Sequence, residues 1–196
     1  PMIKVIVKFP NKVNKKSMEI ITHQVTEFFP DFLIGNAASG LPYLKIASQN
    51  NKEIYNDVIK NWENMLMFHT TFSLGKGNVL NFPLVSDPVV NYNIDKNHLE
   101  LIKKGLEKLC KLMVDAGCDY IYPVTKNPIK LNKDNYIIFI NNIKKINEIN
   151  FSTVHILGGL PMGENKDLCV TDSYGKLHNF ENFYINDSSL ISNKLL

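Results

Sequence analysis

One histidine near the end of the chain stands directly before a glycine-rich loop, in the run VHILGGLPMG. The histidine is His155, and the glycines of the loop are Gly158, Gly159 and Gly163. Glycine lets a backbone approach a ligand closely or adopt a positive φ angle, and an imidazole group titrates near neutral pH. These residue types suit a base that faces a flat or anionic ligand. A histidine beside such a turn is more often structural, so the loop alone does not assign a function.

The loop is not a dinucleotide-binding fingerprint. The run GGLPMG lacks the spacing G-x-G-x-x-G, no clear helix follows it, and the motif occurs nowhere before His155. If the chain acts on a cofactor through this loop, it does so without the glycine pattern that binds a pyrophosphate at the start of a helix.

The residues downstream of the loop extend the pattern. The run from His155 onward resembles the C-terminal signature of the glucose–methanol–choline (GMC) flavin oxidoreductases, because three segments recur in order with suitable gaps. The match covers about the last fifth of the chain, and the run GNVLNFPLVSDPVVNYNI resembles the substrate-domain hairpin and strand of that family. The matched positions are His155, Gly158, Gly159, Met162, Gly163, Val170, Asp172, Gly175, His178, Phe183, Tyr184, Ile185, Asp187, Ser188 and Ser189.

The resemblance implies an FAD-dependent oxidoreductase that acts on CH–OH donors, an alcohol dehydrogenase or oxidase. On this interpretation His155 accepts the hydroxyl proton of a small alcohol while a hydride leaves the carbinol carbon for flavin N5. Asp187 contacts the ribityl–phosphate region of FAD with the Ser188 backbone close by, and Gly158 and Gly159 let the chain approach the cofactor. The alternative for Asp187 is an aspartate that caps a turn or a helix, and for His178 we expect a structural hydrogen bond.

Two departures from the family pattern bear on the interpretation. No adenine-binding G-x-G-x-x-G precedes His155, and the second active-site residue, an asparagine or histidine, is expected just past Leu196. Asn193 comes too early and lacks the expected proline after it. The chain is therefore interpreted as the C-terminal part of a larger enzyme, inactive in isolation. Whether oxygen or a quinone-like compound accepts the electrons stays open.

Two alternatives of other classes remain. The chain could be a remnant or binding module that keeps the fold without turnover. It could also be a lyase on the same scaffold, which uses His155 as an acid and base on a hydroxynitrile while the flavin has only a structural role. Bleaching of the flavin by an alcohol without air separates an oxidoreductase from a lyase.

Composition limits the other function classes. The 196 residues are 44% hydrophobic, so they can form a sizeable core, and the net charge is only +3. All 22 basic residues are lysines scattered along the chain, with no arginine for bidentate contacts, which argues against a nucleic-acid partner. No apolar run reaches the length of a membrane span.

Cysteine usage predicts free thiols. The chain has three cysteines, Cys110, Cys118 and Cys169, an odd number without the spacing of a zinc site. We therefore expect no metal site and a reducing compartment, which predicts a cytoplasmic location.

Hydrophobic periodicity predicts the elements that must position the loop. Glycine at position 117 is expected to end the longest helix, and the turn-forming run GKGN is expected to join residues 65–74 to 79–84 as a hairpin. The expected helices are 17–29, 43–49, 53–61, a long one from 95 or 97 to 116, and 134–146. The other expected strands are 2–9, half-buried and interrupted by lysines, 87–94 and 119–123.

The mixture of strands and long helices predicts an α+β fold. Residues 1–150 are expected to form a substrate-binding domain with an antiparallel sheet and covering helices. After residue 150 the composition changes to glycines, turns and short extended pieces. Residues 151–196 are therefore expected to carry the catalytic histidine and a segment of an incomplete FAD-binding domain.

Overall fold

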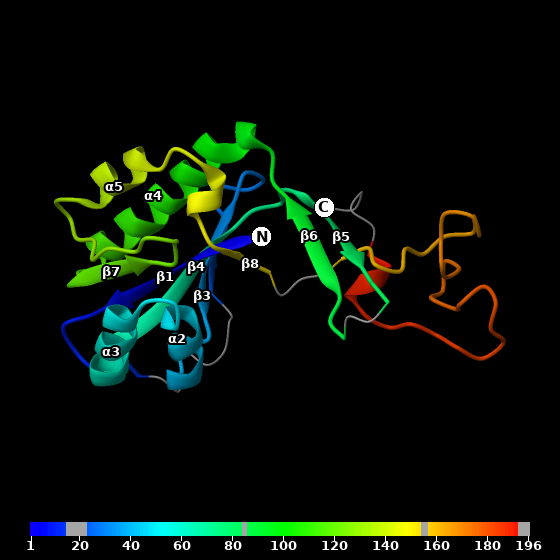
Figure 1. Ribbon diagram of the computed structural model, residues 1–196, viewed down its shortest axis with the longest axis horizontal. Helices are drawn as coiled ribbons and strands as arrows, with labels where there is room; N and C mark the ends of the chain where they lie inside the picture. Colours follow the sequence, from blue (N-terminus) through cyan, green and yellow to red (C-terminus); the bar gives the residue numbers. More distant parts are fainter. Residues whose placement is uncertain (15–22, 84–85, 154–156, 192–196) are drawn as a thin grey trace. The chain divides into compact units, whose positions relative to one another are not determined.

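The computed structural model describes residues 1–14, 23–83, 86–153 and 157–191 (Figure 1). The chain divides into two compact units, Pro1–Ser152 and Thr153–Leu196, and each unit is described by itself. No helix in the described part of the chain is long and apolar enough to cross a membrane.

The first unit contains both strands and helices. Its strands are β1 (Met2–Lys8), β2 (Gln24–Val25), β3 (Leu33–Ala37), β4 (Met65–Thr71), β5 (Lys76–Leu80), β6 (Val89–Asn93), β7 (Tyr120–Pro123) and β8 (Phe151–Ser152). Its α-helices are α2 (Leu41–Ser48), α3 (Lys52–Asn61), α4 (Leu99–Asp115) and α5 (Tyr136–Asn142). Short 3-10 turns lie at Trp62–Asn64, Lys96–His98 and Ile146–Glu148.

Six of these strands form one sheet with β1 at its centre. The order is β2-β3-β4-β1-β7, and β8 also pairs with β1. Every pairing is antiparallel. Strand β4 lies along one edge of β1, while β7 and β8 share the other edge. The predicted mixed α/β content with an antiparallel sheet is therefore confirmed.

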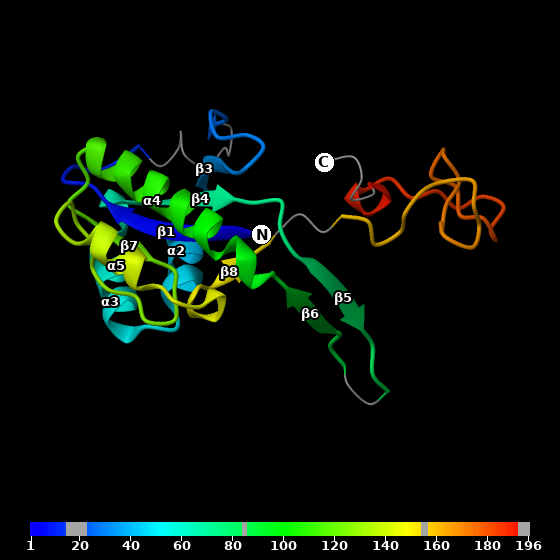
Figure 2. The ribbon, with the colours of Figure 1, turned by 90° about the horizontal axis from the view of Figure 1, so that it is seen from above.

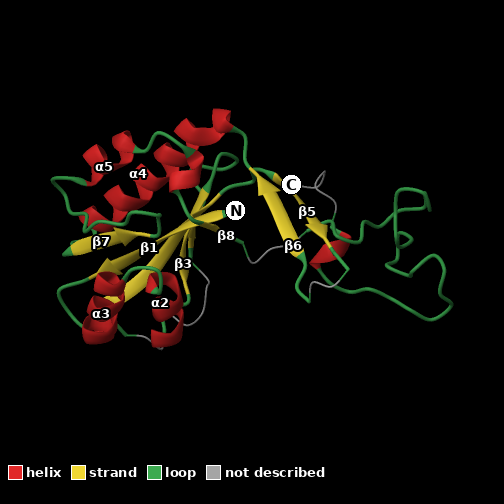
Figure 3. Ribbon diagram, in the orientation of Figure 1, coloured by secondary structure: helices red, strands yellow, loops and turns green. Residues whose placement is uncertain are grey.

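Helices cover both faces of this sheet, as Figure 3 shows. Ile3, Val5 and Val7 of β1 pack in a cluster with apolar residues of α4 and α5, whereas Ile6 packs with residues of α2 and α3. The prediction of a half-buried first strand was wrong for this reason, because a central strand between two helical layers is buried on both sides. The lysines that suggested a solvent face are only partly exposed, and Lys8 forms an ion pair with Asp119.

Helix α4 packs closely against the sheet. Its buried positions recur at helical spacing, as the sequence predicts, and Gly117 follows its end with a φ of 79°. Gly105 lies where α4 approaches β4, and the Thr70 hydroxyl donates to the Gly105 carbonyl at 3.2 Å. A Cβ atom at Gly105 would come within 2.6 Å of the Phe72 ring, so the close approach requires glycine.

The expected helix at 17–29 is wrong over its described part. Residues 15–22 lie outside the described residues, and Gln24–Val25 forms a strand that pairs with β3. The backbone then turns, with the Phe29 N–H donating to the Thr26 carbonyl at 3.0 Å. Pairing with the edge of β3 has overridden the local helical pattern.

The expected hairpin through GKGN is also wrong. Strand β4 pairs with β1 on one edge and β3 on the other, so it has no free edge for residues 79–84. Gly75 bends the chain with a φ of 85°, and β5 then pairs with β6 as a separate two-stranded sheet (Figure 2). The Tyr92 ring covers Gly75 and Gly77, and its hydroxyl donates to the Leu74 carbonyl.

The second unit is held by turns rather than by long strands. Its described backbone contains isolated bridges at Met162–Thr171, Thr171–Leu177 and Lys176–Tyr184, and one 3-10 turn, Ser188–Leu190. Thr171 takes part in two of these bridges and is fully buried. The bridges bring the glycine loop and the two segments that follow it together.

Candidate functional site

The predicted catalytic base falls on a part of the chain that is not described. His155 belongs to residues 154–156, which lie outside the described residues. The geometry of the candidate site therefore comes from the motif residues that follow it, from Gly158 to Ser189.

The glycine loop lies beside the turn that begins at Asp187. The Leu160 N–H donates to the Ser189 carbonyl at 3.1 Å. Gly158 has a φ of 70°, a conformation that favours glycine. Gly159 is exposed. Among the described residues, its two chain neighbours aside, only the Ser189 Cβ lies within 4 Å of a Cβ built on Gly159, at 3.8 Å. The bare backbone at Gly159 is therefore accessible next to this turn.

Asp187 caps the short turn Ser188–Leu190. Its Oδ1 atom accepts the Ser189 N–H at 2.7 Å. Hydrogen bonding from Ser189 lowers the pKa of the Asp187 carboxyl group, so the carboxylate form is favoured. The capping role is the alternative that the sequence left open for Asp187, and the carboxylate is also exposed at the surface of the unit. Ser188 is exposed beside it.

The middle motif segment is a tight turn. The Asp172 Oδ1 atom accepts the N–H groups of Tyr174, at 2.9 Å, and Lys176, at 3.0 Å. These backbone hydrogen bonds, the one from Lys176 first, lower the pKa of Asp172. Gly175 is buried with a φ of 80°, and its carbonyl accepts the Ile185 N–H at 2.8 Å. The turn thereby joins the middle segment to the last one.

His178 joins the middle segment to the glycine loop. Its Nε2 atom lies 3.0 Å from the Gly163 carbonyl oxygen. A carbonyl only accepts, so Nε2 is the donor in this contact. The His178 N–H also donates to the Val170 carbonyl at 3.2 Å. The expected structural hydrogen bond of His178 is confirmed.

The structure thus brings together four of the five predicted site residues. Gly158 and Gly159 lie on the loop that is bonded to Ser189, and Asp187 and Ser188 form the turn that contains Ser189. Sequence reasoning did not single out Thr171, although its carbonyl accepts the Gly163 N–H at 2.9 Å and its backbone lies at the centre of the unit. Only its position between two matched residues, Val170 and Asp172, could have indicated it.

Metal-binding and cysteine chemistry have no support in the described residues. The described part of the chain contains no group of three or more histidine, cysteine, aspartate or glutamate side chains that could hold a metal ion. All three cysteines are free thiols, as predicted. Burial raises the pKa of the Cys110 thiol to about 12.

Comparisons with known proteins identify the family of the chain. A family model described as GMC oxidoreductase matches residues 83–195, more than half of the chain. The chain is also 24% identical, over 193 residues, to an uncharacterized GMC-type oxidoreductase, y4nJ, of Sinorhizobium fredii (strain NBRC 101917 / NGR234). The alignment covers 97% of the chain but only 38% of the length of that relative. The extent of the family match shows that the chain belongs to the GMC oxidoreductase family.

Proposed function

We propose that the chain forms part of an FAD-dependent oxidoreductase that acts on the CH–OH group of a small alcohol. In this proposal residues 1–150 bind the substrate, and residues 151–196 carry the catalytic His155 and a segment of the FAD-binding domain. A further flavin-binding region comes from outside these residues. The observation that carries the proposal is the hydrogen bond from Leu160 to Ser189, which fixes the glycine loop beside the Asp187 turn.

The residues at this place fit a flavin cofactor. Gly159 presents exposed backbone with no side chain to keep a ligand away, and the nearest described atom to a Cβ there, apart from its chain neighbours, is the Ser189 Cβ. Asp187 presents an exposed carboxylate that can accept hydrogen bonds from the hydroxyl groups of a ribityl chain. Ser188 would contribute its backbone next to that chain. When bound, FAD would supply the hydride acceptor that no amino-acid side chain provides.

His155 would act as the base that accepts the proton in the reaction. A neutral imidazole can accept the hydroxyl proton of the alcohol, and without such a base an alkoxide of high energy would have to form. The short link from His155 to Gly158 ties the imidazole to the loop that is bonded to Ser189. The base and the Gly159 contact would thereby lie on one segment, which is hydrogen-bonded to the segment that carries the Asp187 contact.

Flavin reduction by an alcohol without air tests the proposal. We expect an alcohol substrate to bleach the flavin of the holoenzyme that contains this chain, and His155→Gln to slow that bleaching by roughly 10²–10⁴-fold. His98→Gln, at the start of α4, is the matched control and should leave the rate unchanged. An unchanged rate in His155→Gln would remove the histidine from the mechanism. Cleavage of a hydroxynitrile without bleaching would identify the lyase instead.

A further inference from the structure

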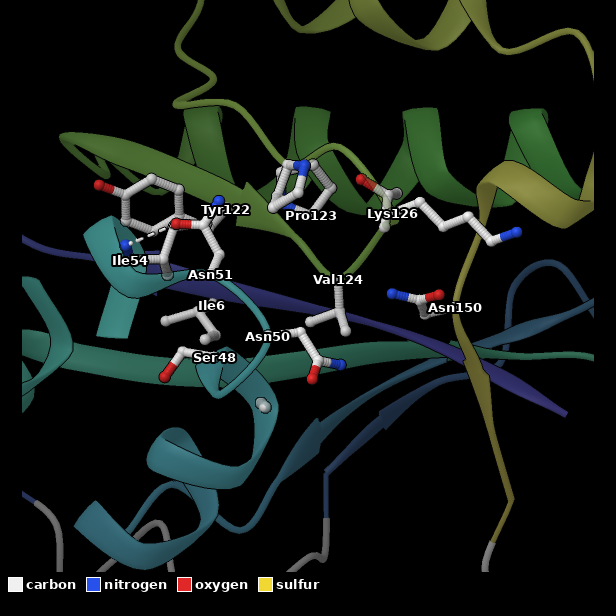
Figure 4. A pocket seen from close by; sticks show the side chains of 13 residues that line it. Ile6, Ser48, Asn50, Asn51, Ile54, Tyr122, Pro123, Val124, Lys126 and Asn150 are labelled. Carbon is white, nitrogen blue, oxygen red and sulfur yellow. Dashed lines mark hydrogen bonds between the residues drawn. The ribbon is translucent and has the colours of Figure 1, made fainter. Parts of the chain in front are cut away.

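The first unit contains a cavity away from the residues discussed so far. Its volume is about 210 Å³, and Figure 4 shows the side chains around it. Asn50 and Asn51 line it from the turn between α2 and α3, Thr125 and Lys126 from the segment after β7, and Asn150 from the residue before β8. The walls are joined, because the Lys126 N–H donates to the Glu148 carbonyl at 2.9 Å. Three separate segments therefore build the cavity, and backbone hydrogen bonds join two of them, the segment after β7 and the segment before β8.

Several polar side chains of the cavity can donate hydrogen bonds to a ligand. The Asn51 Oδ1 atom accepts the Ile54 N–H at 3.0 Å, as the cap of α3, so its amide NH₂ group remains to donate (Figure 4). Thr125 is only 7% exposed, and its hydroxyl oxygen has no hydrogen-bond partner among the described residues. Lys126 lies at the rim as an exposed residue, and its side chain extends away from Asn51 in Figure 4. None of the described lining residues is acidic. A buried hydroxyl without a partner is rare and indicates that a water molecule or a ligand satisfies it.

The remaining wall is apolar and rigid. Ile6 and Ile54 contribute buried side chains. The Tyr122 ring lines the cavity, and its hydroxyl donates to the Asp57 Oδ2 atom at 2.9 Å. This hydrogen bond holds the ring in place before any ligand arrives, which lowers the entropy cost of binding.

We propose that this cavity binds a small monocarboxylate. The carboxylate group would accept hydrogen bonds from Asn51 and the Thr125 hydroxyl, and a short alkyl chain would lie on Ile6 and Ile54. The exposed Lys126 side chain, which extends away from Asn51 in Figure 4, would turn toward the carboxylate from the rim. A carboxylate accepts from several donors at once, and charge-assisted hydrogen bonds of this kind are stronger than neutral ones. The volume limits the ligand to a short chain. The site does not depend on a flavin, and its test is independent of the proposed oxidoreductase activity.

Titration of the full chain with acetate, propionate and butyrate, followed by ¹H–¹⁵N NMR, tests the proposal. We expect saturable shifts at the side-chain amides of Asn51 and Asn150 and an affinity that rises about fourfold per added methylene group. Lys126→Gln should weaken butyrate binding by about two- to fivefold, because it removes a charged donor on an exposed side chain. Lys133→Gln changes an exposed lysine that does not line the cavity and should leave the affinity unchanged.

Three results would overturn the proposal. The first is that sodium chloride at equal ionic strength produces the same shifts, which would indicate general screening by salt. The second is equal affinity in Lys126→Gln with a native spectrum. The third is no saturable shift up to about 100 mM butyrate, a concentration at which even very weak binding is detectable. Thr125→Val keeps the shape of the threonine and should also weaken binding, so the proposal does not depend on a single variant.

Discussion

The Leu160 N–H donates to the Ser189 carbonyl at 3.1 Å, and the N–H of the same Ser189 donates to the Asp187 Oδ1 atom at 2.7 Å. One residue therefore connects the glycine loop to the carboxylate that we assign to the cofactor. A displacement of the loop would move the Ser189 peptide and with it the cap that orients Asp187. The glycine loop and the Asp187 carboxylate, the two proposed cofactor contacts, are therefore coupled through Ser189.

Gly105→Ala should destabilise the first unit although alanine favours helices. Alanine gains about 1 kcal/mol of helix preference over glycine. The new methyl group would lie 2.6 Å from Phe72 Cζ and 2.9 Å from Thr70 Cγ2, so α4 must move away from the sheet. Overpacking of this kind costs about 1–3 kcal/mol, and we expect the free energy of unfolding in urea to fall on balance. Gly105→Ala with Phe72→Leu should recover part of the loss, and no recovery would contradict the steric explanation.

Asp57→Asn should weaken the contact between α3 and β7. The Asp57 carboxylate accepts the hydroxyl groups of Tyr120, at 2.6 Å, and Tyr122, at 2.9 Å, and the Asn61 amide at 2.7 Å. Burial tends to raise the pKa of Asp57, but the hydrogen bonds from the tyrosines and Asn61 outweigh it and lower the pKa. Loss of the charged acceptor should reduce the free energy of unfolding by about 1–2 kcal/mol near pH 7.

The effect of Asp57 should depend on pH in one direction. Because its pKa is lower in the folded chain, the carboxylate stabilises the fold above the ordinary aspartate pKa of about 4, and the contribution disappears as the pH falls through the folded value. The difference in unfolding free energy between the native chain and Asp57→Asn should therefore narrow in acid. Asp134→Asn, at an exposed aspartate, should show no such difference. A gap that stays constant into acid would argue that Asp57 acts without its charge.

Cys110 and Cys118 should both react slowly with an alkylating reagent in the folded chain. Burial first, and then the nearby Cys118 and Glu107, raise the pKa of Cys110 to about 12, and burial first raises the pKa of Cys118 to about 11. At about pH 8 only roughly one Cys118 side chain in a thousand would be a thiolate, and fewer of Cys110. Mass spectrometry after brief iodoacetamide treatment should find little modification of either residue in the folded chain and full modification in urea. Rapid labelling of Cys110 in the folded chain would contradict its burial.

The sequence predicted the elements whose signals are local. Helix α4 was predictable because its apolar residues repeat at helical spacing and Gly117 ends it, and β6 and β7 were predictable from short β-rich runs. Strand β2 and the pairing of β5 with β6 were not predictable. They depend on which strand edges remain free after β1, β3 and β4 have paired. The burial of β1 on both faces likewise depends on the helices that the rest of the chain supplies.

The residues of the candidate site could be predicted from the sequence, whereas the cavity of the first unit could not. The motif order predicted the residues that meet at the turn of the second unit, and the role of His178 followed from its place in that turn. The cavity beside Lys126 was not predictable, because Asn51, Thr125 and Asn150 come from three distant segments with no common spacing. Such a site exists only after the sheet has brought those segments together.

Gly159→Leu should separate flavin binding from folding. The nearest atom to a new Cβ would be the Ser189 Cβ at 3.8 Å, an ordinary contact, and the residue is exposed, so the second unit should keep its fold. The leucine side chain would nevertheless occupy the bare backbone that we assign to FAD. We expect the flavin content of the purified holoenzyme to fall at least tenfold, roughly the effect of losing 1.4 kcal/mol of binding energy. Leu168→Ala, at an exposed leucine of the same unit, should retain the flavin. Full flavin content in a folded Gly159→Leu protein would show that the cofactor does not approach this loop, and the position of the proposed site would then be wrong.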